Sequence, residues 1–279
     1  MNKINKRRPK DIFTKILIWF FSLITLGTLA CIIGYIVYNG AGYISWDFIT
    51  TINKPNEGLN GIFPMIISTF YMIAVTIVIS TPIGVFTAVY LTEYSKPGKV
   101  LKAIRFAIET LSGIPSIIYG LFGFLFFVTL MQLGFSLLSG ALTLSIMVLP
   151  TIIRTTEEAL KSVPVSYREG NLALGASRLA TITRVVLPCA VPGILTSVVL
   201  STGRIVGETA ALIFTSGIVS RTPESLMSSG RTLALHLYLL AANGTSFEQA
   251  FATATILLIV VAIINFTSGR IAAGLKAKG

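Results

Sequence analysis

Residues 16–38 read ILIWFFSLITLGTLACIIGYIVY, a run of 23 residues without a charge. A helix needs about 20 apolar residues to cross the hydrocarbon core of a bilayer. The run exceeds the core of a secretory signal peptide, which has roughly 7 to 15 residues, and it lacks the usual small-residue cleavage pattern. It therefore predicts a retained transmembrane helix.

The rest of the chain continues this pattern. Over 279 residues, 53% are hydrophobic and only 12% are charged, and the mean hydropathy of +0.82 is too high for a water-soluble domain of this length. Six segments reach spanning length or come close to it, and the fourth is the shortest. They are residues 16–38, 63–92, 106–132, 138–153, 189–215 and 248–269. We expect an all-α integral membrane protein with six transmembrane helices.

The Lys and Arg residues are distributed unequally between the two sides of the predicted spans. The formal net charge is +11, and 18 of the 22 Lys and Arg residues lie before the first span, in the two loops at residues 96–105 and 154–184, or from Arg270 onward. Only Lys54, Arg221 and Arg231 lie on the other side, and Arg204 lies inside a span. Cytoplasmic loops carry the excess of Lys and Arg, so both termini are predicted in the cytoplasm of a multi-pass cell-membrane protein that binds no nucleic acid.

Several kinds of chemistry are excluded by missing motifs. Gly98-Lys99 is not part of a phosphate-binding loop, because Val100 follows it and Glu93 stands where the first glycine would be. The chain has one histidine and two isolated cysteines, and no cluster suggests a hydrolytic triad or a catalytic metal. We expect no cofactor and no enzymatic activity. His236 is interpreted as a polar side chain at the membrane interface.

The strongest local signal is in the long loop after the fourth span. Residues 167–177 read YREGNLALGAS, and residues 184–188 read RVVLP. Glu169 followed by small residues and then Gly175 predicts a short exposed helix with a glycine at its end. Such a helix is suited to close contact with another protein.

This loop resembles the EAA signature of importer-type ABC permeases, in which a glutamate is followed six residues later by glycine and then by an apolar-x-Leu-Pro ending. The matching residues are Glu169, Gly175, Val185, Leu187 and Pro188. The resemblance implies a coupling helix that docks into a cleft of an ATPase subunit. The residues it implicates are Glu169, Gly170, Asn171, Gly175, Ala176 and Ser177. Two of them, Gly170 and Asn171, replace alanines that are usual in the family.

Ionisable residues inside spans are costly and are functional hypotheses by default. Arg204 lies 15 residues after Cys189, which places it roughly 22 Å along a helix and near the middle of the membrane. Glu208 is expected one turn further on the same face. We interpret Arg204 as the partner of a translocating oxyanion and Glu208 as the residue that holds it when the path is empty, with a purely structural ion pair as the alternative. Arg154 is either a second anion contact or a residue that marks the membrane boundary.

Two further segments indicate which substrate the permease carries. Residues 112–123 read SGIPSIIYGLFG and residues 203–210 read GRIVGETA. Both resemble the phosphate-specific transport permeases, and the second is most similar to the PstA-type member of the heterodimeric pair. This resemblance, over residues 60–270, implies the type I importer fold with a cytoplasmic coupling helix. It also implies a PstC-type second permease, two PstB-type ATP-binding subunits and a PstS-type extracytoplasmic phosphate-binding protein.

The sequence thus predicts a permease subunit that carries inorganic phosphate inward, powered by separate ATPase subunits. A permease for sulfate or molybdate is the alternative within the class, and a self-sufficient channel or ion-coupled carrier is the alternative outside it. We expect residues 1–60 to form the N-terminus, first span and outer loop, residues 61–270 the permease domain, and residues 271–279 a cytoplasmic tail.

Overall fold

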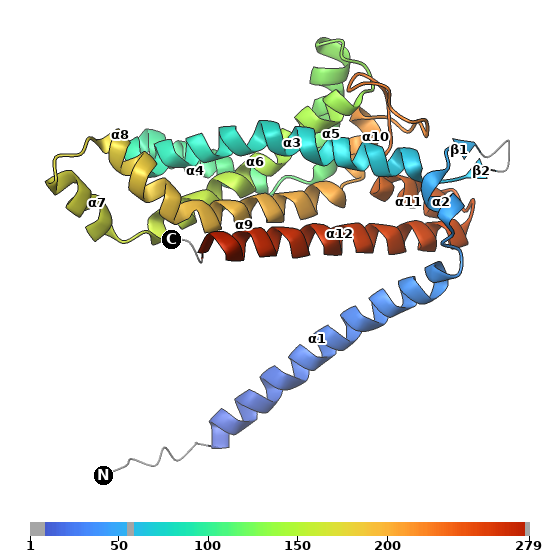
Figure 1. Ribbon diagram of the computed structural model, residues 1–279, viewed down its shortest axis with the longest axis horizontal. Coiled ribbons are helices and arrows are strands. Elements are labelled where there is room, and N and C mark those ends of the chain that lie inside the picture. The colour runs from blue at the N-terminus through green and yellow to red at the C-terminus, as the bar shows by residue number, and fades with distance from the viewer. Residues whose placement is uncertain (1–8, 55–58, 277–279) are drawn as a thin grey trace.

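The computed structural model describes residues 9–54 and 59–276, and these are almost entirely helical (Figure 1). The first half contains α1 (Pro9–Ala41), α2 (Trp46–Thr50), β1 (Asn53–Lys54), β2 (Leu59–Asn60), α3 (Phe63–Val89), α4 (Lys99–Ser112) and α5 (Ser116–Gly123). The second half contains α6 (Leu137–Ser162), α7 (Val165–Ala173), α8 (Arg178–Thr181), α9 (Leu187–Val206), α10 (Ala210–Thr215), α11 (Leu233–Ala242) and α12 (Phe247–Lys276). Three π-helical segments extend them: η2 (Tyr90–Tyr94), η3 (Phe124–Leu130) and η4 (Ile182–Val186). The antiparallel β1–β2 ladder has two residues per strand.

Five helical stretches are long and apolar enough to cross a membrane, and a bent sixth forms if α4 and α5–η3 count as one span. Helices α3, α6, α9 and α12 run side by side, whereas α1 projects away from them, with α7 and α8 at one end of the bundle and the β1–β2 hairpin with α11 at the other (Figure 1). We call these the α7 end and the hairpin end. The fourth predicted span is longer than expected, because α6 continues to Ser162.

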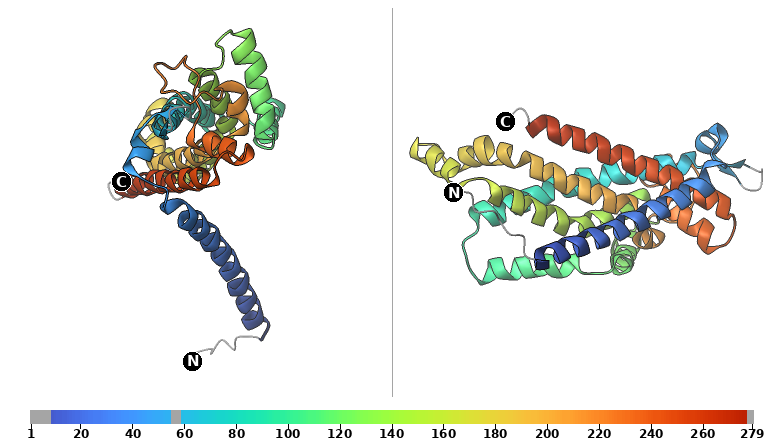
Figure 2. Two further views of the ribbon diagram at one scale, coloured as in Figure 1. Left: turned by 90° about the vertical axis from the view of Figure 1, so that its right-hand side faces the viewer. Right: turned by 90° about the horizontal axis from the view of Figure 1, so that it is seen from below.

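The third predicted span is not one continuous helix. Between α4 and α5–η3 the chain bends by 100°, and the bend falls at residues 113–115. Pro115 has no N–H to donate and disfavours helical geometry in the residue before it, so the ladder stops there. The Tyr119 hydroxyl donates to the Leu111 carbonyl at 2.7 Å, which satisfies one carbonyl at the helix end. Figure 2 shows the segment after the bend standing away from the main bundle axis.

The core lies where α3, α6 and α9 meet. Buried Met72, Leu144, Met147 and Ile205 form its apolar part. Small residues let the helices approach closely, as in other membrane bundles. A Cβ added to Gly84 of α3 would lie 2.6 Å from Cγ2 of an isoleucine on α6.

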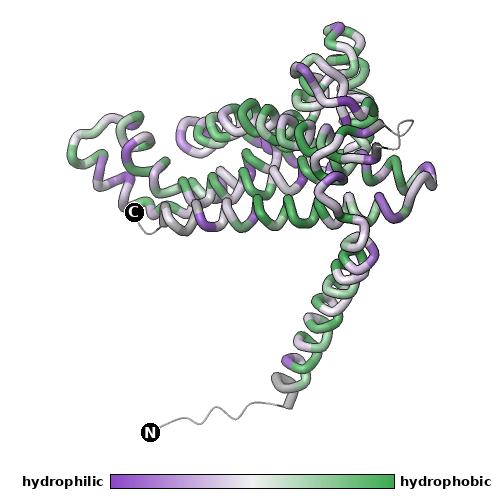
Figure 3. Tube along the Cα trace, turned by 45° about the vertical axis from the view of Figure 1, so that its right-hand side comes forward, coloured by the Kyte–Doolittle hydropathy of each residue, from purple (hydrophilic) through white to green (hydrophobic). Residues whose placement is uncertain are grey.

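The first helix has a different environment. The most apolar 18-residue window of α1 has no residue that is buried by the described part of this chain, and hydrophobic residues follow most of the helix (Figure 3). Only its C-terminal part meets α12, where the rings of Tyr35 and Phe251 pack edge to face at 5.6 Å. Its apolar surface therefore requires lipid or another membrane helix.

A substitution at Gly84 tests whether α3 and α6 pack as closely as the structure shows. Gly84→Ala directs a methyl group at Ile152, whose side chain is fully buried. We expect a loss of about 1–3 kcal/mol, as for other overpacked cores, seen as a lower melting temperature in detergent. Gly269→Ala on α12 is the control, since its new Cβ would have no neighbour within 4 Å. Equal melting temperatures for the two variants would contradict this packing.

Candidate functional site

The predicted short helix is present as α7, at the tip of the α7 end (Figure 1). It begins after Pro164 and is followed by Gly175, whose φ of +82° is a left-handed conformation that glycine adopts without strain. Ser177 then caps α8 by accepting from the Ala180 N–H. Glu169 and the surrounding loop surface are exposed. The sequence pattern therefore yields a protruding loop with a capped helix on each side of the turn.

The two residues that depart from the family pattern have different roles. A Cβ added to Gly170 would meet nothing within 4 Å, so this position contributes open surface. Asn171 faces inward, and its amide donates to Oγ1 of Thr181 at 3.0 Å. This bond joins α7 to α8, which alanine could not do.

A buried ion pair fixes the base of α7. Arg168 donates to Oε1 of Glu93 from Nε at 3.1 Å and from Nη2 at 2.9 Å. It also donates to the carbonyls of Val163 at 2.7 Å and Leu160 at 2.8 Å. The side chains of Glu93 and Arg168 are only 10% and 18% exposed. We call this pair the clasp.

The clasp connects α7 to the end of α3, because Glu93 lies in η2, which continues that helix. Arg178 of α8 donates to the backbone carbonyl of Glu93 and lies 5.2 Å from the centre of the Tyr94 ring. Our sequence analysis missed Glu93 and Arg168. The available signal was a lone carboxylate at the end of an apolar span, but nothing in the sequence identified its partner 75 residues later.

The fifth predicted span is also interrupted, next to Arg204. Helix α9 ends at Val206, and α10 begins at Ala210. Glu208 lies in the break, where its Oε1 accepts the N–H of Ala211 at 3.1 Å. Glu208 is thus not one helical turn beyond Arg204, and within the described residues the two form no ion pair.

Arg204 lies where the two interrupted spans meet. The α5 and α10 halves pack tightly, since a Cβ on Gly120 would lie 2.8 Å from Cα of Ala211. Tyr119 of α5 is within electrostatic range of the half-buried Arg204. Gly203 is exposed beside it and has open space where a side chain would be. The arginine is therefore held at a junction of broken helices with a free face next to it.

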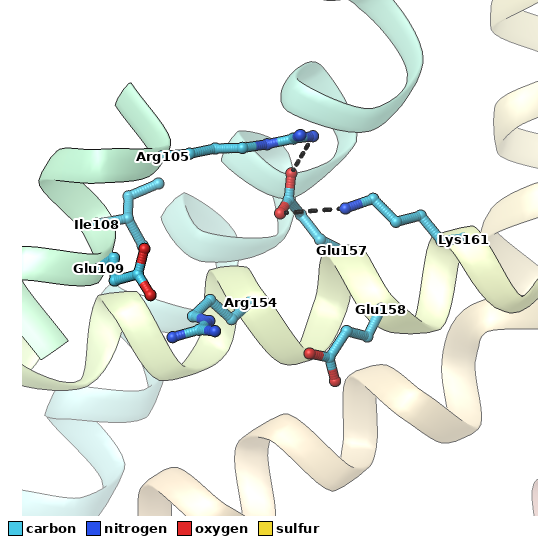
Figure 4. Close-up of a pocket in the computed structure, with 7 residues that line it drawn as sticks. All are labelled: Arg105, Ile108, Glu109, Arg154, Glu157, Glu158 and Lys161. Carbon is cyan, nitrogen blue, oxygen red and sulfur yellow. Dashed lines mark hydrogen bonds and ion pairs between the residues drawn. The ribbon is translucent and has the colours of Figure 1, made fainter. Parts of the chain in front are cut away.

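Arg154 belongs to a separate pocket of about 210 Å³ near the α7 end (Figure 4). Its charged lining residues are Arg105, Glu109, Arg154, Glu157, Glu158 and Lys161. Glu157 binds two of the cations, Arg105 at 3.3 Å and Lys161 at 3.6 Å. Arg154 lies between the other two carboxylates in Figure 4, and Arg204 does not line this pocket. Three cations and three carboxylates balance here, which makes the pocket a poor match for an anion.

Residues 80–277 match the family of the binding-protein-dependent transport system inner membrane component. The chain belongs to this family. It is therefore a multi-pass membrane permease of the ABC importer type, a transport subunit and not an enzyme, as the sequence predicted.

Relatives with named functions give more detail. The chain is 34% identical over 274 residues to a probable ABC transporter permease protein, YqgI, of Bacillus subtilis, and the match covers 92% of this chain and 93% of the relative. It is 31% identical over 262 residues to the phosphate transport system permease protein PstA 1 of Mycobacterium tuberculosis strain H37Rv, with 93% of this chain and 84% of the relative covered.

Solved structures share the fold of this permease. A bacterial alginate ABC transporter in complex with an alginate-bound periplasmic protein matches with a TM-score of 0.66 at 21% identity, over 96% of this chain and 99% of that chain. The inward-facing MetNI methionine ABC transporter matches with a TM-score of 0.62 at 22% identity, over 80% of this chain and 99% of that chain. The predicted type I importer fold is confirmed.

The clasp can be tested by local hydrogen exchange. Glu93→Gln leaves the mostly buried Arg168 without its charge partner, and breaking a buried pair in this way costs about 3–5 kcal/mol before relaxation. We expect faster amide exchange over α7 and α8 and unchanged exchange in α12. Glu158→Gln, an exposed carboxylate at the same end of the molecule, is the matched control. Unchanged exchange of α7 in Glu93→Gln would show that the clasp does not hold the loop.

Proposed function

We propose that this permease subunit translocates inorganic phosphate and that Arg204 is its intramembrane anion contact. The observation that carries the proposal is the position of Arg204 at the junction of two interrupted spans. Irregular backbone at membrane depth is tolerated only where protein buries it or where it lines a water-filled cavity. Discontinuous helices next to an unpaired cation are therefore suited to a translocation path.

The chemistry of Arg204 fits an oxyanion. A guanidinium presents planar donors that match phosphate oxygens, and within the described residues no carboxylate neutralises it. Gly203 and Gly207 are both exposed and leave room beside it. The 31% identity to a named phosphate transport permease supports phosphate over other oxyanions.

Glu208 has a different role from the one the sequence suggested. Its carboxylate caps α10 through the Ala211 N–H, an arrangement that favours negative charge at a helix start. This contact keeps the carboxylate engaged away from Arg204. We propose that Glu208 maintains the break in the span and so shapes the path indirectly.

In this proposal the ATPase subunit docks at the α7 end and drives transport from there. The exposed surface of α7 and the turn at Gly175 dock onto an ATPase subunit, with Glu169, Ala176 and Ser177 at the contact. Leu172 and Leu174 are 48% and 87% exposed and supply apolar surface for such a contact. The clasp then passes movement of α7 to α3, which packs against α6 in the core.

The similarity to phosphate transport permeases and the charge distribution support a proposal for the full assembly. We propose a heterodimer with a PstC-type permease, two PstB-type ATPase subunits at the α7 end and a PstS-type binding protein at the hairpin end. The cation-rich loops lie at the α7 end, which therefore faces the cytoplasm together with both termini. Of the two roles considered for Arg154, we propose the marker of the cytoplasmic membrane boundary. An anion contact is disfavoured because the pocket around Arg154 has balanced charge.

Another oxyanion is the second candidate, because a guanidinium alone does not separate phosphate from sulfate or molybdate. The similar fold of alginate and methionine transporters shows that architecture does not select the substrate. Competition of phosphate uptake by sulfate and molybdate separates these possibilities.

The test of Arg204 is ATP-dependent uptake of radiolabelled phosphate by vesicles that contain the four kinds of subunit. Arg204→Gln removes the charge while preserving much of the side-chain length. We expect at least about a tenfold loss of uptake, the value of one charge-assisted hydrogen bond, with normal assembly. Arg221→Gln, an exposed cation outside the spans, should retain uptake. Wild-type uptake by Arg204→Gln would remove this residue from the mechanism and leave the family assignment intact.

The test of the docking loop is co-purification of the ATPase subunits. Gly175→Leu places a bulky side chain on the exposed turn and also strains a left-handed residue. Gly175→Asn is the control, because asparagine tolerates this conformation and adds less bulk. We expect loss of the ATPase with leucine and substantial retention with asparagine. Equal co-purification of wild type and Gly175→Leu would exclude a contact at this turn.

A further inference from the structure

A second polar pocket, of about 370 Å³, lies at the hairpin end, and Arg204 is not among the residues that line it. Its polar lining comes from the β1–β2 hairpin, from α11 with the loop before it, and from the start of α12. The residues used below are Asn53, Asn60, Arg231, His236, Asn243 and Gln249. None of the described residues that line it is acidic.

His236 is the most unusual member of this pocket. The expectation of an exposed interfacial side chain is wrong, because His236 is only 1% exposed. Thr232 starts α11 by accepting from the Leu235 N–H, and this register turns His236 inward. Neither ring nitrogen has a hydrogen-bond partner among the residues that the structure describes. Buried polar atoms are normally paired, so these nitrogens indicate a missing ligand or solvent.

Arg231 also has a buried nitrogen whose hydrogen-bonding capacity is not used. Its Nη2 donates to Oδ1 of Asn53 at 3.4 Å, a long bond. Its Nε is buried and has no partner within residues 9–54 and 59–276. Burial lowers the pKa of Arg231 to about 10, so the guanidinium stays charged at neutral pH. Burial and the nearby Arg231 charge lower the pKa of His236 to about 3, so the imidazole stays neutral. The pocket combines one positive charge with neutral hydrogen-bond donors.

We propose that this pocket binds a small monovalent oxyanion, either monobasic phosphate or a carboxylate, between Arg231 and His236. An anion here would pair with the unsatisfied Nε of Arg231 and accept from a ring N–H of His236. The amides of Asn60, Asn243 and Gln249 line the same space and supply further donors. The site is separate from the proposed contact at Arg204 and does not depend on phosphate being the transported ion.

Binding would also tie together segments distant in sequence. Arg231 precedes α11, His236 lies within it, and Asn53 belongs to the hairpin before α3. An anion bridging these groups would restrict opening of the hairpin end. Water alone is the competing occupant, because a polar cavity of this size also accommodates solvent.

The experiment measures hydrogen exchange over residues 231–246 in the assembled transporter in nanodiscs, without its binding protein. An Arg204→Gln background prevents phosphate binding at Arg204 from contributing to the result. Sodium phosphate and sodium acetate are compared with sodium chloride at equal ionic strength. At about ten times the dissociation constant, we expect roughly tenfold slower exchange of α11 amides. Slowing by phosphate alone assigns a tetrahedral oxyanion, slowing by acetate alone assigns a carboxylate, and slowing by both supports the shared class.

Variants identify the residues responsible. Arg231→Gln should abolish the slowing, Arg231→Lys should retain part of it, and Arg221→Gln, an exposed cation of the loop before α11, should retain it fully. His236→Leu keeps the volume but removes the ring N–H, and it should weaken the effect. If neither anion slows exchange, or if Arg231→Gln responds like the Arg204→Gln background, the pocket holds only water and the proposal is overturned.

Discussion

Backbone N–H and C=O groups inside a bilayer must find partners within the protein, because hydrocarbon offers none. Continuous helices meet this requirement by themselves, and most of the chain adopts them. The two interruptions need help from side chains. Tyr119 donates to a carbonyl at the end of α4, and Glu208 accepts an N–H at the start of α10. The breaks occur where α5 and α10 pack together, so shielding and side-chain partners occur at the same place.

This constraint explains why the functional proposals concentrate at a few positions. An arginine inside a span is costly, and at the junction of the broken spans Arg204 has Tyr119 nearby and no carboxylate partner among the described residues. At the α7 end, by contrast, the arginine is fully paired. Arg168 is buried, and its charge is satisfied by Glu93 and two carbonyls. An unpaired cation suits ligand binding, whereas a saturated one suits mechanical attachment.

Sequence reasoning succeeded where the cause of structure is local. Spans follow from apolar length, and the left-handed turn at Gly175 follows from the conformational freedom of glycine. Sequence reasoning failed where a local pattern is compatible with more than one structure. Pro115 can bend a helix slightly or end it, and the tertiary structure shows that α4 ends before it and that the chain bends by 100°. His236 could face the interface or the interior, and the register of α11 after Thr232 decided for the interior.

The sequence by itself determined that this chain is a membrane permease. It also predicted an exposed short helix in the loop after the fourth span and placed an arginine within the fifth apolar segment. Composition, span length and the spacing of the loop motif are properties of neighbouring residues, so they can be read directly. Only the tertiary structure decided which charges meet. Glu93 and Arg168 are 75 residues apart and join, whereas Arg204 and Glu208 are separated by three residues and do not. Ion pairing depends on distance in space, and the positions where helices end set that distance.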